Sequence, residues 1–473
     1  MGEEIYNLAF DFGASNGRLM LSKYDGYKIS LEEIYRFPNE PVRAGGRLYW
    51  DFLKLFSELK VGLKMVSERN INISSIGIDT WGVDYGLLDK NDRLISNPVH
   101  YRDSRTNKIP EKVEKIVPFQ EFYNMTGIQF LQFNTVYQLY DDLESGILRN
   151  AKTLLFMPDL FSFYLTGEKY NEYTISSTSQ MLDANKKNWS YDILDKLCIA
   201  KNILQEIIMP GNIYGCLSSD IRDETGLPKI PVIAVGCHDT ASAVAGTPLS
   251  SHNSAYLSCG TWSLLGIETQ KPIIDENSLK FNFTNEGGVL GTIRFLKNIT
   301  GLWLIQQLRR SWANRGIKLD FPDIISRASS AKNANYYIDP DDELFMAPDD
   351  MGDAICRYCM KTGQGRPDNI GDIARAAYNG ITKHYKETIE NIEKITGNEI
   401  DTVNIVGGGI RDEFLLKQTA SITGRKILAG PVEASILGNC IIQLMALKAI
   451  KNLDEGRNII KNSFPLKEYK PMQ

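Results

Sequence analysis

Apolar and polar positions along the first 80 residues follow a pattern that predicts strands, tight turns and one helix. Apolar runs separated by glycine-containing turns predict strands at about residues 5–12, 18–24 and 27–37. Apolar residues then recur at helical spacing between residues 50 and 70, which predicts an amphipathic helix. The apolar run at residues 73–79 predicts a short buried strand. The order strand, strand, strand, helix, strand is typical of an α/β domain.

A similar succession begins in the middle of the chain. Residues 254–269 have the pattern of two short strands joined at a glycine, like the hairpin near the N-terminus. The remaining pattern predicts a helix at 372–396, a strand at 401–406 that ends in three glycines, a helix at 411–423, a strand at 426–430 and a helix at 433–450. Two halves that open alike predict two similar α/β domains around a cleft. Because residues 244–254 are mostly small and polar, we place the domains at 1–248 and 249–473.

The composition is that of an ordinary globular protein and argues against several classes of function. Of the 473 residues, 43% are hydrophobic and 23% are charged. A net charge of −5 argues against a nucleic-acid binder that works through a broad basic surface. No run approaches the roughly 18 apolar residues of a membrane span, and no secretory signal is visible at the N-terminus. We therefore expect a cytoplasmic protein with small-molecule ligands, no nucleic-acid partner and no membrane partner, either a monomer or a small homo-oligomer.

The cysteines do not form the pattern of a disulfide framework or of a zinc site. There are seven, an odd number, and they are widely scattered. Only Cys356 and Cys359 form a C-x-x-C pair, without a second pair or a nearby pair of histidines. Unpaired thiols are the favoured interpretation.

The two glycine hairpins are candidate phosphate-binding loops. In "DFGASNGR", glycine lets the backbone approach a phosphate, Asp11 could hold Mg²⁺ through water, and Arg18 could neutralise phosphate charge. The segment "SCGTWS" repeats the turn with the hydroxyl of Thr261. A plain hairpin with a surface arginine is the alternative. A P-loop and a dinucleotide-binding G-x-G-x-x-G motif are both absent from the sequence.

Two strand ends carry candidate sugar-binding and catalytic residues. In "IDTWGVDYG", the indole of Trp81 lies between Asp79 and Asp84, an arrangement that suits a sugar, although a core tryptophan is the alternative. In "PVIAVGCHDT", the apolar run at residues 231–235 predicts a strand, and Asp239 shortly after its end could accept a proton. The alternative role for Asp239 is a helix N-cap, and for its neighbour His238 a structural, hydrogen-bonded histidine.

A third glycine-rich loop and two isolated amides complete the candidates. The loop "VGGGI" lies between a predicted strand and a predicted helix, where it would admit a flat ring or a ribose, although such loops are common. Asn298 and Gln306 are possible polar ligands.

Taken in order, these segments resemble the FGGY carbohydrate kinases of the actin-like ATPase superfamily. The resemblance covers nearly the whole chain and rests on "DFGASNGR", "IDTWGVDYGLLD", "HYRDSRTN", "GCHDTASAV", "CGTWSLLG", "LKNITGLWLIQ", "VGGGI" and "GPVEASILGN". It implies an α/β fold of two ribonuclease H-like domains that flank a central cleft. One departure is that "MPDLFSFYLTG" lacks the lysine and tryptophan of the first general family signature.

The resemblance also implies a role for individual residues. It makes Asp239 the catalytic base and places Asp11 beside the metal ion, Mg²⁺. It assigns ATP binding to Ala14, Ser15, Asn16, Gly17, Arg18, Thr261, Gln306 and Gly408, and sugar binding to Gly82, His238, Thr240 and Asn298.

The branch of the family that the chain resembles most implies ATP-dependent phosphorylation of L-rhamnulose at its 1-hydroxyl. Fuculose, xylulose, ribulose or glycerol are alternative substrates, because one hydroxyl can decide specificity. An actin-like ATPase without a sugar substrate and a sugar-sensing regulator are alternatives from other functional classes.

Overall fold

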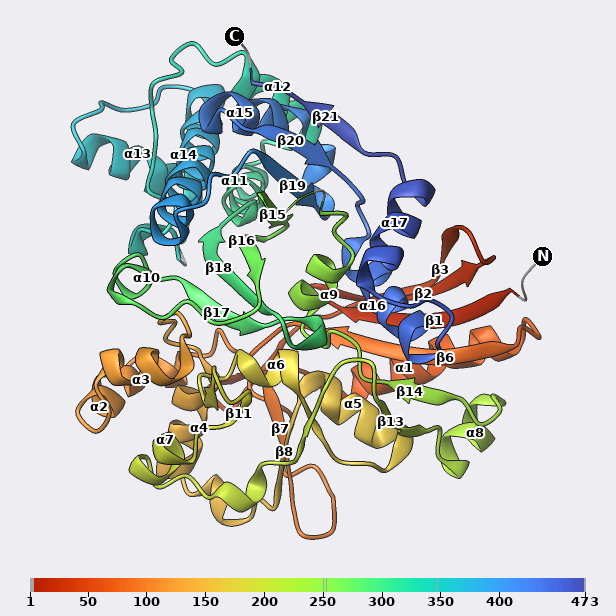
Figure 1. The fold of residues 1–473 in the computed structure, drawn as a ribbon. Helices are drawn as coiled ribbons and strands as arrows, with labels where there is room; N and C mark the ends of the chain where they lie inside the picture. Colours follow the sequence, from red (N-terminus) through yellow and green to blue (C-terminus); the bar gives the residue numbers. More distant parts are fainter. Residues whose placement is uncertain (1–3, 250, 252, 347, 472–473) are drawn as a thin grey trace. The chain divides into compact units, whose positions relative to one another are not determined.

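The computed structural model describes residues 4–249, 251, 253–346 and 348–471 and divides into two compact units (Figure 1). Unit 1 comprises Met1–Pro248, Glu268–Phe295 and Ala434–Phe464, whereas unit 2 comprises Leu249–Ile267, Leu296–Glu433 and Pro465–Gln473. Two segments that follow residue 249 in the sequence therefore fold with the N-terminal part of the chain. The division of the chain into domains at residues 1–248 and 249–473 remains a prediction from the sequence.

The centre of unit 1 is a six-stranded sheet with the order β13-β14-β6-β1-β2-β3. The strands β1, β2 and β3 form an antiparallel meander, and β6 and β14 extend the sheet parallel to β1. The bounds are β1 (Ile5–Phe12), β2 (Asn16–Tyr24), β3 (Ile29–Pro38), β6 (Ile73–Thr80), β13 (Ile213–Cys216) and β14 (Pro231–Ile233). The three predicted strands, the helix and the following strand are all present, but two short strands that were not predicted, at residues 42–44 and 47–49, precede the helix.

Helices cover both faces of this sheet because side chains alternate along each strand. Phe10 and Leu19 face α1 (Phe52–Ser67), where Gly62 comes close to their side chains. On the opposite face, Asn7 of β1 faces α16 (Ala434–Ala446) and donates a hydrogen bond to Gln443 (3.4 Å). Figure 1 shows α1 and α16 on opposite sides of β1 and β6.

Two predicted elements of unit 1 are shorter in the structure. The helix expected at residues 50–70 begins only at Phe52, because the side chain of Asp51 caps it by accepting the backbone N–H of Lys54. The strand expected from residue 231 to 235 ends at Ile233. The chain then runs alongside the end of β6, where Thr80 and His238 form an isolated parallel bridge.

The rest of unit 1 consists of short helices and two-stranded ribbons. The ribbons pair β4 (Val42–Ala44) with β5 (Arg47–Tyr49), β7 (Tyr85–Leu88) with β8 (Thr153–Phe156), β9 (Asn171–Glu172) with β12 (Ile207–Ile208), and β10 (Leu182–Asp183) with β11 (Asn188–Trp189). The helices are α2 (Ile109–Glu114), α3 (Phe119–Thr126), α4 (Thr135–Glu144), α5 (Met157–Thr166), α6 (Tyr173–Ser177), α7 (Tyr191–Lys196), α8 (Ser219–Thr225), α9 (Asp239–Ala245), α10 (Glu276–Lys280) and α17 (Leu453–Ser463).

The second sheet repeats the topology of the first. Its order is β17-β18-β16-β15-β19-β20-β21. The hairpin β15–β16 is antiparallel and is followed by β19 and β20, parallel to β15, as β1–β2 is followed by β6 and β14. The bounds are β15 (Ser254–Cys259), β16 (Trp262–Thr269), β17 (Thr284–Gly287), β18 (Ile293–Thr300), β19 (Thr402–Val406), β20 (Lys426–Ala429) and β21 (Lys467–Tyr469). The predicted internal repeat is therefore confirmed at the level of topology.

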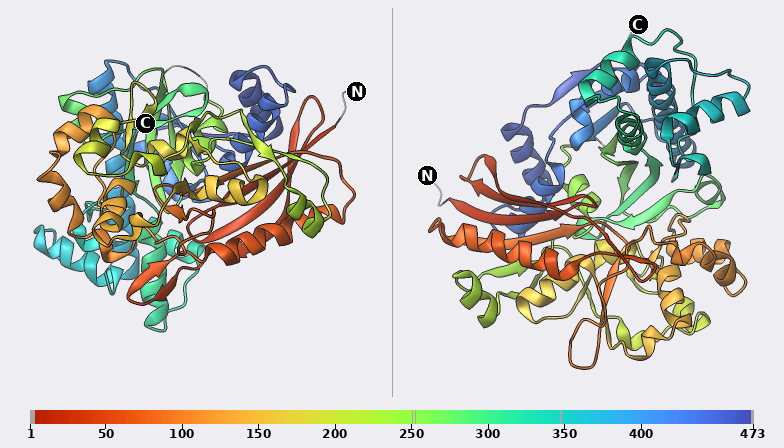
Figure 2. Two further views of the ribbon diagram at one scale, coloured as in Figure 1. Left: turned by 90° about the horizontal axis from the view of Figure 1, so that it is seen from below. Right: turned by 180° about the vertical axis from the view of Figure 1, so that it is seen from behind.

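Five helices accompany the strands of unit 2. They are α11 (Trp303–Asn314), α12 (Phe321–Ser329), α13 (Met351–Lys361), α14 (Ile370–Thr396) and α15 (Glu413–Thr423). The helices α14 and α15 lie side by side (Figure 2), and Tyr378 of α14 donates a hydrogen bond to Asp412, the N-cap of α15 (2.6 Å). The long helix predicted at residues 372–396 is confirmed.

Two further observations bear on the sequence analysis. All seven cysteines are free thiols, as expected. Among the described residues, no helix combines the length and the apolar character that crossing a membrane requires.

Candidate active site

Two carboxylates lie next to each other at the ends of neighbouring strands in unit 1. Asp11 of β1 is paired in register with Asp79 of β6 on one side and with Arg18 of β2 on the other. Oδ2 of Asp11 accepts hydrogen bonds from Nη2 (2.7 Å) and Nε (3.1 Å) of Arg18 and from the hydroxyl of Ser435 (3.0 Å). Arg18 is thus bound to the candidate metal residue, which contradicts the alternative of a surface arginine.

Asp79 is the more deeply buried of the two carboxylates. Its Oδ2 accepts a hydrogen bond from the side chain of Asn439 (2.6 Å), whereas its buried Oδ1 has no hydrogen-bond partner among the described residues. Burial and the nearby charge of Asp11 raise the pKa of Asp79 well above that of an ordinary aspartate.

These oxygens fit a hard divalent cation such as Mg²⁺. Such an ion prefers carboxylate oxygens and keeps several of its own water molecules. Asp11 and Asp79 supply two carboxylates, one with a buried oxygen that lacks a hydrogen-bond partner. The sequence analysis assigned only Asp11 to the metal. The signal that could have identified Asp79 as a second metal residue is its place at the end of an apolar strand. In the structure this strand pairs with β1 so that Asp79 lies opposite Asp11.

The segment "GPVEASILGN", on which the resemblance partly rested, supplies the partners of both carboxylates. Ser435 and Asn439 lie one turn apart in α16, on the face that meets β1 and β6. No pattern in the sequence indicates that these two polar side chains contact Asp11 and Asp79.

The loop between β1 and β2 forms a tight turn that its own backbone closes. The backbone N–H of Gly13 donates to the carbonyl of Asn16 (2.9 Å), and the side chain of Asn39 donates to the carbonyl of Gly13 (2.9 Å). Ala14 and Ser15 are exposed, Asn16 is half-buried, and Gly17 is buried against the ring of Phe37. The loop therefore offers its outer residues to solvent at the edge where Asp11 lies.

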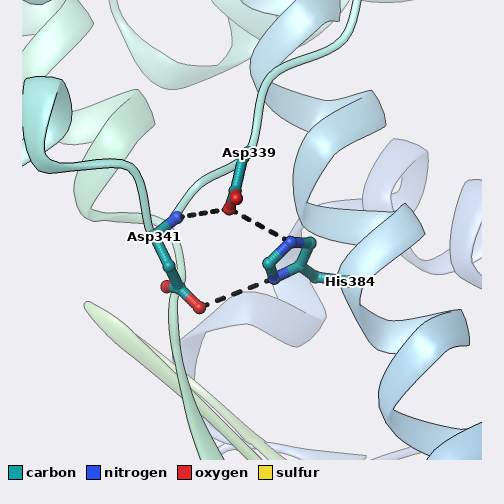
Figure 3. A group of neighbouring side chains, drawn as sticks. All are labelled: Asp339, Asp341 and His384. Carbon is teal, nitrogen blue, oxygen red and sulfur yellow. Dashed lines mark hydrogen bonds and ion pairs between the residues drawn. The ribbon is translucent and has the colours of Figure 1, made fainter. Parts of the chain in front are cut away.

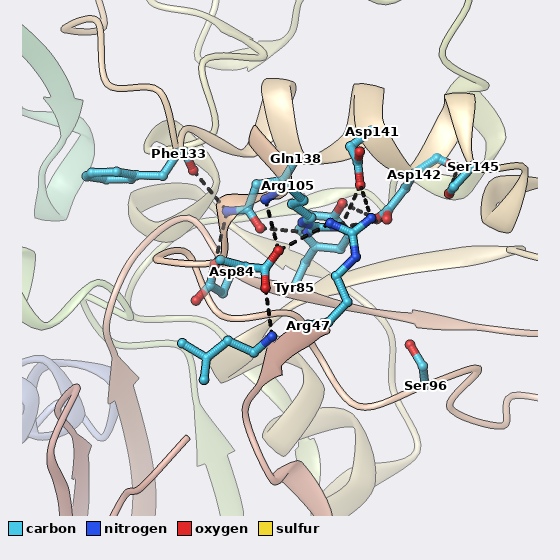
Figure 4. Close-up of polar contacts among 12 residues, drawn as sticks. Arg47, Asp84, Tyr85, Ser96, Arg105, Phe133, Gln138, Asp141, Asp142 and Ser145 are labelled. Carbon is cyan, nitrogen blue, oxygen red and sulfur yellow. Dashed lines mark hydrogen bonds and ion pairs between the residues drawn. The ribbon is translucent and has the colours of Figure 1, made fainter. Parts of the chain in front are cut away.

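Trp81 is a core residue in this structure, which agrees with the alternative to a sugar-binding role. Its indole N–H donates to Asp84 (3.0 Å), which also accepts from the indole of Trp50 (2.6 Å) and the amide of Gln138 (3.0 Å). Burial raises the pKa of Asp84 to about 6. Figure 4 shows how Asp84 and Gln138 continue into a buried polar cluster with Arg105 and its partner Asp142 (2.6 Å).

This cluster fixes the turn that contains Gly82. Val83 has a positive φ of 67°, which a β-branched residue adopts only when its surroundings impose it. Its N–H donates to Thr178 (3.1 Å), and its carbonyl accepts from Thr135 (2.7 Å). Gly82 is thereby held beside His238, since a Cβ added at Gly82 would lie 3.3 Å from Nε2 of the histidine.

Asp239 is the first residue of α9 rather than its N-cap. The N-cap is His238, so the structure excludes the alternative role of Asp239 as the cap of this helix. Oδ1 of Asp239 accepts from the hydroxyl of Thr240 (3.1 Å) and lies 3.5 Å from Nε2 of His238. The side chain stays 34% exposed, and burial of its remaining surface and the charge of Asp11 raise its pKa. A carboxylate with a raised pKa that is open to solvent has the properties of a general base.

The sequence analysis missed two charged partners of His238. Arg294 and Glu286 lie against its Nδ1 at 3.1 Å and 3.4 Å and are almost completely buried. They follow His238 by 56 and 48 residues, and no motif connects them to it. Of the proposed sugar-binding residues, Gly82 and His238 adjoin each other, and buried Thr240 contacts Asp239. Asn298 belongs to unit 2, where it is half-buried in β18.

In unit 2, the structure brings together the three residues assigned to the nucleotide. The carbonyl of Thr261 accepts the N–H of Trp303 (3.1 Å), which attaches the β15–β16 turn to the start of α11, where Gln306 occupies the first turn. The glycine loop lies beside the same turn, since a Cβ at Gly409 would collide with Cys259. A Cβ at Gly408 would meet nothing, so the backbone there is open to a ligand.

One histidine and two aspartates in unit 2 have ligand atoms within 4.8 Å of one another, as in a metal site, and they also pair with one another (Figure 3). Nε2 of His384 lies 3.2 Å from Asp339, and Nδ1 lies 3.6 Å from Asp341. Burial lowers the pKa of His384, but the hydrogen bonds to both aspartates outweigh this effect and raise it to about 9. Both ring nitrogens therefore carry protons at neutral pH, and the cluster is an ion-pair clamp.

Comparison with protein families finds two matches that together cover most of the chain. Residues 6–246 match the N-terminal domain, and residues 255–447 the C-terminal domain, of the FGGY family of carbohydrate kinases. Two relatives carry the name rhamnulokinase. The protein from Bacteroides thetaiotaomicron is 41% identical over 98% of this chain and 95% of its own length. The protein from Halalkalibacterium halodurans is 41% identical over 98% of both chains.

Solved structures agree in fold at much lower sequence identity. The ligand-bound xylulose kinase from Lactobacillus acidophilus has a TM-score of 0.82 at 17% identity and covers 99% of this chain and 94% of its own. The Plasmodium falciparum glycerol kinase with ADP has a TM-score of 0.78 at 15% identity and covers 100% of this chain and 95% of its own. The repeated α/β topology, the carboxylates at the strand ends and the two family matches lead to one conclusion: the chain belongs to the FGGY family of carbohydrate kinases.

Proposed function

We propose that this carbohydrate kinase transfers the γ-phosphoryl group of ATP to the 1-hydroxyl of L-rhamnulose. The products are L-rhamnulose 1-phosphate and ADP. The choice of sugar is supported by the full-length relatives of about 40% identity that are named rhamnulokinase. The observation that carries the chemistry is the half-exposed carboxylate of Asp239, in contact with His238 and close to the charge of Asp11.

Asp239 is the proposed general base. Its carboxylate accepts the proton of the attacking hydroxyl while the new O–P bond forms and the bond to the ADP oxygen breaks. The raised pKa favours this role, because a base works best when its pKa lies near the working pH. Gly82, His238, Thr240 and Asn298 are the proposed sugar-binding residues.

The proposed nucleotide site combines residues from both halves of the sequence. Ala14, Ser15, Asn16, Gly17 and Arg18 form the first phosphate loop, and Thr261, Gln306 and Gly408 complete the set. The open backbone at Gly408 supports an approach by the nucleotide.

Mg²⁺ is the proposed metal ion. Asp11 is proposed to hold it through a water molecule, and Asp79 is proposed as a second carboxylate of the site. When bound, the ion neutralises charge that develops on the transferring phosphoryl group. Arg18 and Ser435 hold Asp11 in place through the hydrogen bonds to its Oδ2.

The test is an ADP-release assay with Mg-ATP against a panel of ketoses and polyols. The expected result is the highest kcat/KM with L-rhamnulose, and a weaker rate with L-fuculose, which differs only in hydroxyl configuration. A clear preference for glycerol or xylulose would reject the proposed sugar and keep the family. If no sugar raises ADP release above background, the kinase function itself is rejected.

We also propose a cytoplasmic location, a monomer or small homo-oligomer, and no nucleic-acid or membrane partner. The small net charge of −5 supports the absence of a nucleic-acid partner. Cell fractionation and size-exclusion chromatography with light scattering test these statements.

A further inference from the structure

Two buried charges that have no part in the proposed chemistry hold the ring of His238. Nη2 of Arg294 lies 3.1 Å from Nδ1 of the histidine, and Oε2 of Glu286 lies 3.4 Å from the same atom. Arg294 and Glu286 also pair with each other at 3.1 Å, with side chains that are 0% and 7% exposed. Such a deeply buried ion pair carries a desolvation penalty, so its contact with a site residue calls for an explanation.

The chemistry of arginine decides which ring nitrogen of His238 carries the proton. A guanidinium has only donors and stays charged at every physiological pH. Nε of Arg294 donates to the carbonyl of Gly287 (2.9 Å), which fixes the plane of the group and directs Nη2 towards Nδ1. Nδ1 must therefore accept, so a neutral His238 carries its proton on Nε2.

The protonated nitrogen faces the site. Nε2 lies 3.5 Å from Oδ1 of Asp239, the proposed base, and 3.3 Å from the position of a Cβ at Gly82. The backbone N–H of His238 donates to the hydroxyl of Thr174 (3.2 Å), which also holds the main chain in place. The ring thus presents one N–H donor directly beside the carboxylate that is to receive the proton.

We infer that Arg294 and Glu286 are positioning residues, which hold His238 in the Nε2–H tautomer so that it donates to a substrate oxygen next to the attacking hydroxyl. The inference rests on the proposed function, which assigns His238 to the sugar. In the proposed sugar, L-rhamnulose, that oxygen is the carbonyl oxygen at C2, beside the 1-hydroxyl. Glu286 balances the charge of Arg294, and without Arg294 it would draw the proton to Nδ1.

The first test determines the tautomer of His238 by NMR and does not depend on an activity assay. The chain has only four histidines, so ¹⁵N-histidine labelling gives few side-chain signals, and His238→Gln identifies the one from His238. We expect Nδ1 at the shift of an unprotonated ring nitrogen and Nε2 at that of a protonated one, in the ligand-free protein at pH 7.5. The opposite tautomer, or a ring protonated on both nitrogens, overturns the inference.

The second test compares Arg294→Met and Arg294→Lys with Arg425→Met. Arg425 of unit 2 also forms a mostly buried ion pair, with Glu393 at 2.8 Å, and is the matched control. Arg294→Met should protonate Nδ1 and raise the KM for the sugar about tenfold, the effect of one lost hydrogen bond, while the KM for ATP stays unchanged. Arg294→Lys keeps a charged donor and should restore most of the wild-type KM, and Arg425→Met should leave it unchanged.

The outcomes separate this inference from the proposed function. If the wild type phosphorylates no sugar, the proposed function fails, whereas the tautomer is still decided by the ¹⁵N spectrum. If the wild type is active and Arg294→Met changes neither the tautomer nor the sugar KM, the positioning role is overturned. Should Arg294→Met not fold, the double variant Arg294→Met/Glu286→Gln leaves no lone buried charge. With neither charge beside Nδ1, both tautomers of His238 should be populated and the sugar KM should rise, while the KM for ATP stays unchanged. A ring still held with its proton on Nε2 and an unchanged sugar KM would overturn the positioning role.

Discussion

At the scale of single residues, the site depends on how each carboxylate is partnered. Asp11 is paired with Arg18, Asp79 is buried with one hydrogen bond from Asn439, and Asp239 is half-exposed beside His238. Three aspartates within one unit therefore have three environments. Environment decides which carboxylate stays ionised and which accepts a proton. Burial and nearby negative charges raise the pKa of a carboxyl group, whereas positive charges and hydrogen bonds to the carboxylate lower it.

Replacement of Asp239 by asparagine tests the proposed base. The amide keeps the shape and can still accept from Thr240, but it cannot take a proton from the substrate. We expect kcat to fall by about 10²–10⁴-fold, equivalent to roughly 2.7–5.5 kcal/mol of barrier, with sugar and ATP still bound. Turnover, ligand affinity and Tm are measured on one preparation, with Asp220→Asn in α8 as the control for an acid-to-amide change near a helix start. Near-normal turnover in Asp239→Asn would reject the base.

At the scale of elements, α9 and α16 cross at very short distance. A Cβ at Gly438 would lie 1.8 Å from the carbonyl oxygen of Ser242, and a Cβ at Gly246 would lie 2.1 Å from that of Ala434. Both obstacles are backbone atoms, which side-chain rotation cannot move. The crossing therefore requires glycine, and it positions α9, whose first residue is Asp239, against the helix that contacts Asp11 and Asp79.

Gly438→Ala is expected to displace α9 and thereby reduce both stability and turnover. A single methyl group against backbone at this distance should cost about 1–3 kcal/mol of unfolding free energy. Gly352→Ala in α13 is the matched control, because its Cβ would meet no atom closer than 3.3 Å and helix propensity alone favours alanine by roughly 1 kcal/mol. Urea unfolding and the ADP-release assay measure both effects. Equal stability of Gly438→Ala and the wild type would contradict the steric argument.

The His384 clamp connects α14 to the loop that carries Asp339 and Asp341. Asp341 also accepts the backbone N–H of Thr300 (3.0 Å) at the end of β18, two residues after Asn298. The positive charge of Lys297 faces the same two aspartates, and Glu387 lies 3.9 Å from the ring on its own helix. The clamp thus links three elements of unit 2 through one protonated ring.

The clamp predicts a loss of stability at alkaline pH. The pKa of His384 is raised from its usual 6.5 to about 9, so its stabilising effect is complete below pH 6.5 and disappears as pH rises through 9. The upper limit of the effect is roughly 3 kcal/mol, at 1.36 kcal/mol per pKa unit. Urea unfolding of wild type and His384→Gln between pH 6 and 10 should show the difference shrinking with pH. A difference that is constant over this range would contradict the clamp.

At the scale of the whole molecule, unit 1 is built from segments that lie far apart in the sequence. Unit 1 is completed by two later segments, of which Ala434–Phe464 follows most of unit 2 in the sequence. Gln443 of α16 accepts from Ser75 (2.7 Å) and donates to the carbonyl of Leu8 (3.0 Å), both of them buried in the first sheet. These hydrogen bonds form only when the C-terminal part of the chain is present.

A fragment of residues 1–248 is therefore expected not to fold cooperatively. Without α16, the buried groups Asp79, Ser75 and the carbonyl of Leu8 lose partners, each at about 1–3 kcal/mol, and the apolar face of β1 and β6 is uncovered. This loss is comparable with the total stability of a domain. Circular dichroism and thermal unfolding of the fragment, with the full chain as reference, give the answer. A cooperative transition near the Tm of the full chain would contradict the prediction.

The sequence by itself determined the local elements and the family. Strand and helix periodicities are local properties, which is why β1, α1, the two glycine hairpins and α14 were predicted within a few residues. Glycines at the turns and the motifs around Asp11, His238 and Asp239 were sufficient for the resemblance to carbohydrate kinases, which the family matches confirm.

Only the tertiary structure decided which polar side chains meet. Asn439 contacts Asp79 across 360 residues of sequence, and Arg294 contacts His238 across 56. It also decided that Asp239 does not cap α9 and that Trp81 is a core residue bound to Asp84. Apolar periodicity specifies which face of an element is buried, but a hydrogen bond between distant segments depends on how sheets and helices pack, and no local pattern records that.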